Sequence, residues 1–132
     1  MIQETNLDVL CAKYGFSIAK NTKDDTLITK ALGVLQEQGP YAYFLFLQSR
    51  GESEKQAALK MIKDSGALIA EIFENLKGRN FQEDWPDILR TKILNDLDNI
   101  FLVLQLLEQT LVYARYHAKS IKDAKSTKEE SK

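Results

Sequence analysis

Residues 97–118 read LDNIFLVLQLLEQTLVYARYHA, and their pattern is the clearest in the chain. Apolar residues recur there at steps of three and four, which places them along one face of an α-helix. The same spacing continues on both sides, so we predict a helix over residues 86–122, roughly 55 Å long at 1.5 Å per residue. A break near Asn95 stays open. Leu104 and Leu107 lie on the apolar face and are predicted core residues.

The first forty residues predict two further helices. An apolar stripe that includes Cys11 runs over residues 7–18 with helical spacing. A second helix begins after Asp24 or Asp25, either of which can cap it, and ends at Gly39, where a glycine tolerates the left-handed conformation of a helix end.

Two more helices are predicted in the middle of the chain. Pro40 suits the first turn of a helix, and residues 41–47, YAYFLFL, are all apolar. A helix that is apolar on every side is typical of the centre of a bundle. Ser53 and Gln56 have the spacing of a capping box and begin a helix that extends to Lys77.

The segment 80–85 is the predicted main loop, after which Asp84 and Pro86 start the long last helix. We therefore expect an all-α, single-domain bundle of about five helices with a long C-terminal helix, covering residues 1–122. Residues 123–132 are predicted to form a charged, flexible tail, because they are nearly devoid of apolar side chains.

Composition excludes several classes of protein. The 132 residues include 18 Lys and Arg, 19 Asp and Glu, one His and one Cys. A single His and a single Cys are too few for a zinc finger, an iron–sulfur protein or a disulfide scaffold. The balanced charge excludes a generic polybasic nucleic-acid binder. Without an apolar leader or about 20 consecutive apolar residues, we expect a cytoplasmic protein that does not contact a membrane.

No arrangement of residues predicts catalysis. Cys11 lies on an apolar stripe and is expected to behave as a small buried hydrophobe, and His117 is expected to be structural or solvated. Asp96 and Asp98 are two residues apart and cannot share a helix face, and no glycine-rich phosphate loop occurs. We expect no enzyme, no catalytic residue, no metal, no cofactor and no small-molecule substrate.

Cationic side chains form the remaining candidate site. Arg115, Lys119 and Lys122 follow one stripe of the last helix, with a tyrosine between them, and Lys60 and Lys63 share a face of the preceding long helix. Such groups can contact a phosphate backbone while tyrosines stack on bases, or they are ordinary solvated faces. The candidate RNA-binding residues are Arg50, Lys55, Lys60, Lys63, Arg79, Arg115, Lys119 and Lys122.

Residues 32–47, LGVLQEQGPYAYFLFL, and residues 113–119, YARYHAK, resemble a known family. It is the small helical subunit of type III-B CRISPR effector complexes, the Cmr module. In that family a helix ends in a glycine, an apolar helix follows directly, and a long C-terminal helix finishes with aromatic, basic and alanine residues. The resemblance covers roughly residues 25–122.

The resemblance implies a non-catalytic subunit in antiviral defence. Several copies would stack head to tail, and they would help hold target RNA along the crRNA backbone. The implied partners are other copies, other subunits and the crRNA–target RNA duplex, contacted at its phosphates. Mixed charge suits such stacking, since acids of one copy can meet bases of the next. The competing interpretation is a helical adaptor or regulatory module without nucleic-acid contact, which an apolar groove with scattered cations would indicate.

Overall fold

The computed structural model describes residues 6–22 and 25–130, with side chains described up to residue 121. These residues contain no strand, so the predicted all-α class with a long C-terminal helix is confirmed. The structure has six α-helices where about five were expected: α1 (Leu7–Thr22), α2 (Asp25–Gln38), α3 (Pro40–Gln48), α4 (Glu52–Ile72), α5 (Phe81–Ile88) and α6 (Leu97–Glu130).

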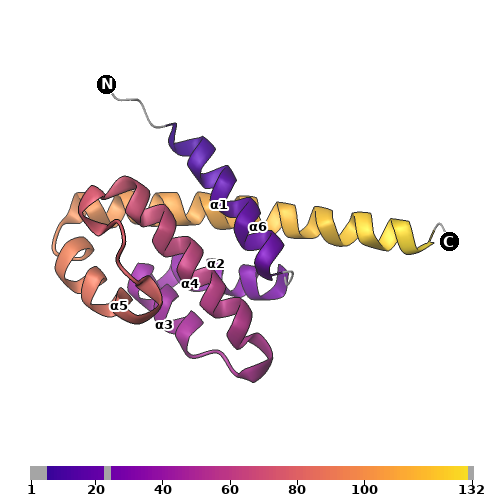
Figure 1. Ribbon diagram of the computed structural model, residues 1–132, viewed down its shortest axis with the longest axis horizontal. Coiled ribbons are helices and arrows are strands. Elements are labelled where there is room, and N and C mark those ends of the chain that lie inside the picture. Colours follow the sequence, from indigo (N-terminus) through magenta and orange to yellow (C-terminus); the bar gives the residue numbers. More distant parts are fainter. Residues whose placement is uncertain (1–5, 23–24, 131–132) are drawn as a thin grey trace.

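The long helix α6 is the axis of the molecule. Figure 1 shows the other helices gathered around its first half, while its last turns extend beyond them toward the C-terminus. The helix α1 crosses α6 at Gly15, where an added Cβ would lie 2.8 Å from both the carbonyl oxygen of Thr110 and the Cβ of Tyr113. Only a residue without a side chain permits this approach, so Gly15 sets the distance between the two helices.

The core between α3, α4 and α5 is aromatic. The rings of Phe44 and Trp85 stack with centroids 5.6 Å apart, and the indole nitrogen of Trp85 donates to Gln48. The buried hydroxyl of Tyr43 shares a 2.7 Å hydrogen bond with Ser65. The indole N–H of Trp85 and the hydroxyl of Tyr43 thus each have a hydrogen-bond partner. These bonds avoid the cost of burying a polar group unsatisfied.

The helix α3 is buried on one side only, although its sequence is apolar all round. Pro40 is its first residue and Gly39 precedes it with φ 93°, as predicted. Tyr43, Phe44 and Leu47 are buried, whereas the side chain of Leu45 is 52% exposed. The prediction that this helix is enclosed on every side is therefore wrong, because α3 is covered by its neighbours on one side only.

Both predicted ends of the fourth helix are wrong. The helix α4 begins at Glu52 after an extended Gly51, and no side chain caps it, so Ser53 and Gln56 form no capping box. It ends at Ile72 rather than at Lys77. A short 3-10 turn, η1 (Glu74–Leu76), follows and directs the buried Leu76 back into the core.

The predicted main loop is the helix α5. Asn80 caps it, because its side-chain oxygen accepts a hydrogen bond from the backbone nitrogen of Gln82 at 3.1 Å. Pro86 lies inside α5 instead of starting the last helix. A π-helical turn, η2 (Leu89–Ile93), follows. Asp96 then accepts a hydrogen bond from the backbone of Asn99 and caps the start of α6, so the break near Asn95 is present.

The buried face of α6 is rotated slightly from the predicted one. Leu107 is fully buried, as expected, but Leu104 is only partly buried, and Val103 is buried instead. Both α1 and α2 pack against α6, and Leu104 lines a hollow together with Phe101 and Glu108. The helix also includes residues 123–130, which the sequence assigned to a tail.

Candidate nucleic-acid interface

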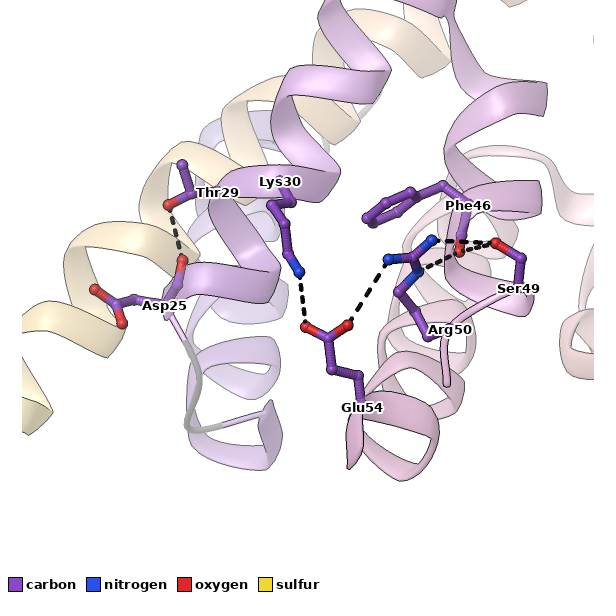
Figure 2. A network of polar contacts seen from close by, with 7 residues as sticks. All are labelled: Asp25, Thr29, Lys30, Phe46, Ser49, Arg50 and Glu54. Carbon is purple, nitrogen blue, oxygen red and sulfur yellow. Dashed lines mark hydrogen bonds and ion pairs between the residues drawn. The ribbon is translucent and has the colours of Figure 1, made fainter. Parts of the chain in front are cut away.

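Arg50 is held inside the fold by the network in Figure 2. Its guanidinium lies 3.8 Å from the centroid of the Phe46 ring, and its Nε donates to the Phe46 carbonyl at 3.0 Å. Glu54 lies 3.8 Å from Arg50 and 3.0 Å from Lys30, so the carboxylate links α3 and α4 to α2. Arg50 therefore stabilises the corner between these helices, and its charge is already partnered.

Arg79 and Lys63 line the same pocket. The guanidinium of Arg79 lies 3.9 Å from a carboxylate oxygen of Asp84 and 3.7 Å from one of Asp87, both on α5. The pocket has a volume of about 520 Å³ and lies between α4 and the segment that leads into α5. Of the eight candidate cations, these two are the ones that line it.

Lys55 and Lys60 are exposed on α4. Neither forms an ion pair with a residue that the structure describes. Neither lines a described pocket. They contribute positive charge to the surface of α4 without a shaped site around them.

Arg115 and Lys119 are exposed one turn apart on α6, as the predicted stripe requires. The side chain of Lys122, the third member of the stripe, lies outside the described residues. Neither Arg115 nor Lys119 pairs with a described acid. Tyr116 between them is 67% exposed. From residue 109 to residue 122 the chain contains no Asp or Glu, so this part of α6 is uniformly basic.

An exposed aromatic pair lies at the seam between α1 and α6. Phe16 of α1 meets His117 of α6 edge to face, with ring centroids 5.4 Å apart and an interplanar angle of 84°. The side chain of Phe16 is 48% exposed, although a large aromatic ring is usually better buried. At 100° per residue around α6, Tyr116 lies about 100° from His117, and Lys119 and Arg115 each lie about 160° from it, toward the side of α6 that faces away from the seam.

The outward face of α1 adds two more cations. Lys13 and Lys20 lie three residues before and four residues after Phe16, on the same side of the helix. Lys13 lies 3.9 Å from Glu71, an exposed pair of the kind that contributes little stability. We define the α1–α6 surface as Lys13, Phe16, Lys20, Arg115, Tyr116, His117 and Lys119.

Sequence reasoning found the α6 part of the α1–α6 surface, Arg115, Tyr116 and Lys119, and missed Lys13, Phe16 and Lys20 of α1. It treated His117 as an isolated residue, because Phe16 is 101 positions away and the contact depends on how α1 crosses α6. One signal in the sequence could have identified Phe16 as a surface residue. It lies off the apolar stripe of its own helix, so it is not needed for the core.

Asp8 of α1 forms a hydrogen bond with α6. The hydroxyl of Tyr113 donates to Asp8 at 2.5 Å, linking α6 to α1. This hydrogen bond to the carboxylate raises the pKa of Tyr113, because ionising the phenol would place two negative charges together. The bond fixes the angle at which the two helices cross.

The groups considered for catalysis are placed as follows. Cys11 is buried, its thiol donates to the carbonyl of Leu106, and burial raises its pKa. A protonated thiol is a poor nucleophile. Among the side chains that the structure describes, no group of three His, Cys, Asp or Glu residues could hold a metal ion. The described residues include no helix long and apolar enough to cross a membrane.

Comparison with known proteins finds no match to this chain. No family model, no curated protein and no solved structure matches it. Its function is therefore inferred from its own residues and from the resemblance in its sequence.

Proposed function

We propose that this chain is a non-catalytic, RNA-binding subunit of a type III-B CRISPR effector complex. In this role it acts in antiviral defence, stacks in several copies and helps hold target RNA along the crRNA. The α1–α6 surface is the observation that carries the proposal. It combines exposed aromatic rings with basic side chains on a part of α6 that has no acidic residue.

Four residues of the α1–α6 surface contact RNA in this proposal. Arg115 and Lys119 contact phosphate oxygens, which provide affinity without sequence information. Tyr116 and Phe16 offer ring faces on which bases stack, a contact worth about 1–3 kcal/mol per base. Because every base has such a face, we expect binding with little sequence preference.

Assembly supplies the affinity that one copy lacks. The chain has a net charge of -1, so a free monomer is expected to bind RNA weakly at physiological salt. Stacked copies align several basic surfaces, and their contacts then add as in other multivalent systems. The complex is therefore expected to bind much more tightly than the free chain.

The salt dependence of RNA binding tests this proposal. The changes Arg115→Glu, Lys119→Glu and Lys122→Glu are combined, and affinity for unstructured RNA is measured over a range of salt concentrations. Loss of three phosphate contacts is expected to flatten the slope of log affinity against log salt by about 2. Circular dichroism should show unchanged helix content, since these positions lie on an exposed stripe.

The matched control is the combination Lys55→Glu, Lys60→Glu and Lys92→Glu, which changes the net charge equally at exposed positions elsewhere. It should leave the slope near the wild-type value. The proposal fails if the α6 variant keeps the wild-type slope, or if the control flattens it by the same amount.

One observation favours the adaptor as the second candidate. Leu97 and Phe101 near the start of α6 are 64% and 58% exposed. Phe101 also lines a shallow hollow of about 350 Å³. Isolation of the native complex separates the two functions. Co-purified RNA supports the RNA-binding subunit. A protein partner without RNA, released by Phe101→Ser, supports the adaptor.

A further inference from the structure

The pocket between α4 and α5 is unusually basic for a chain with balanced charge. Lys63, Lys77 and Arg79 line it, against one acid, Glu71. Lys63 forms no ion pair with any described residue, and Glu71 lies 3.9 Å from Lys13. The side chains that line the pocket therefore include three cations and one acid, a balance that favours an anionic ligand.

The other two cations are only loosely engaged. Lys77 lies 3.1 Å from Glu74 in a pair whose side chains are both more than half exposed. Arg79 has its carboxylate neighbours at 3.7 Å and 3.9 Å, beyond good hydrogen-bonding distance. Exposed pairs of this kind stabilise a fold little, so a ligand can take over these cations at small cost.

Backbone donors lie beside the cations. The N–H groups of Gly78, Asn80 and Phe81 donate to no residue that the structure describes, and all three residues line the pocket. Gly78 has φ 84°, a backbone conformation that is strained for any residue with a side chain. This position in the turn therefore requires glycine. Phe81 opens α5; its own N–H has no partner among the described residues, whereas those of Gln82, Glu83 and Asp84 donate to Asn80, and the helix dipole favours negative charge there.

The α4 side of the wall also carries small residues, Gly66, Ala67 and Ala70. Ala67 and Ala70 face the pocket from α4, and the ring of Phe81 lies so near Gly66 that a Cβ there would overlap it. Small residues thus leave room for a flat group beside the cations. A volume of about 520 Å³ lies within the range of small-molecule sites, roughly 300–1,000 Å³.

We infer that this pocket binds a nucleotide through its terminal phosphate. Lys63, Lys77 and Arg79 contact the phosphate, with the backbone donors at Gly78 and Phe81 beside them. The base lies against the alanine wall of α4. The phosphate belongs either to a free nucleotide or to the end of a nucleic-acid chain. The inference does not depend on the proposed RNA-binding role of the α1–α6 surface.

Titration of the full chain tests the inference, with AMP, adenosine and inorganic phosphate as probes. Binding is followed by the amide resonances of Gly78, Asn80 and Phe81. AMP should bind saturably and shift these resonances, and adenosine should bind at least about tenfold more weakly because it lacks the charged group. Short RNAs with and without a 5′-phosphate form a second pair of probes. Tighter binding of the phosphorylated RNA than of AMP assigns the site to chain ends, and equal binding assigns it to the free nucleotide.

The variant Lys63→Gln/Lys77→Gln should weaken AMP binding about tenfold or more, since both changes remove charge at exposed positions. Lys55→Gln/Lys60→Gln is the matched control on the same helix and should bind AMP as the wild type does. The inference is overturned if AMP shows no saturable binding, if adenosine binds equally well, or if both variants lose affinity alike. The α6 triple variant should bind AMP normally, which separates this result from the test of RNA binding.

Discussion

Burial of the Asp64 carboxylate costs desolvation free energy. Its carboxylate accepts hydrogen bonds from Ser17 at 3.1 Å and Asn21 at 3.3 Å. Burial nevertheless outweighs these bonds and raises the pKa of Asp64 above its ordinary value of 3.8. The native state therefore binds this proton more tightly than the unfolded chain does. Its contribution to stability falls as the pH rises from 3.8 through the folded-state pKa.

Asp64→Asn removes this titration while keeping an oxygen that can accept from Ser17. We expect the stability of the variant, relative to the wild type, to increase between pH 4 and pH 7. Urea unfolding of both proteins at the two pH values measures the difference. A difference that stays constant, or that decreases with pH, would show that Asp64 is not held in a desolvating site.

Leu107 and Leu104 show how burial sets the cost of a substitution. Leu107 is fully buried, and Leu107→Ala is expected to cost about 2–5 kcal/mol of unfolding free energy. Leu104 is only partly buried, so Leu104→Ala should cost less than about 2 kcal/mol because less apolar area is lost. Equal losses in urea unfolding would mean that the face of α6 has been assigned wrongly.

Glycines determine how closely the helices approach. At Gly15 a Cβ would press on the backbone of α6, whereas at Gly33 in α2 nothing lies within 4 Å of an added Cβ. Gly15→Ala is expected to destabilise the fold by about 1–3 kcal/mol through overpacking. Gly33→Ala should stabilise it by up to about 1 kcal/mol, because alanine is the better helix former. Thermal unfolding of both variants checks the contrast, which would disappear if α1 and α6 were not in contact at Gly15.

Helical periodicity predicted the existence of the helices better than their ends. The predicted stripe of α2 is buried throughout, at Leu27, Ala31, Leu32 and Leu35, and α6 is buried at Leu107, Leu111, Ala114 and Ala118 as its stripe predicts. The predicted helix ends were wrong where two sequence signals favoured different start residues. Pro86 favours a first turn, but Asn80 supplies a side-chain cap six residues earlier, so α5 starts there and includes the proline. The N-cap of α4 is Gly51, with extended backbone, so the helix begins two residues earlier than a cap at Ser53 would place it.

The candidate site depends on contacts that no local pattern contains. Charge and spacing identified Arg115 and Lys119 correctly as exposed neighbours. The same reasoning chose Arg50, which pairs with Glu54 four residues later in the chain. Only the link from Glu54 to Lys30 of α2 depends on tertiary packing. Phe16 and His117 are brought together only when α1 crosses α6. Sequence spacing predicts which residues share one helix face, and tertiary packing decides which faces meet.

The whole molecule is a long helix that carries a small bundle on its first half (Figure 1). Exposed basic and aromatic side chains lie farther along it. We propose that RNA lies on these side chains. In that arrangement bases stack near Phe16, Tyr116 and His117, while phosphates lie near Arg115 and Lys119. Because stacked rings are the groups closest to a bound base, they are also the groups that react when the base is excited by light.

Photo-crosslinking followed by peptide mapping tests this claim most directly. The native assembly, or the free chain at low salt, is irradiated with bound RNA that contains photoreactive uridines. The crosslinked residues are then identified by mass spectrometry. We expect adducts at Phe16, Tyr116 or His117, and a strong decrease in the variant Phe16→Ala/Tyr116→Ala. Crosslinks that map only to other helices, or that are unchanged in the variant, would contradict the proposed interface.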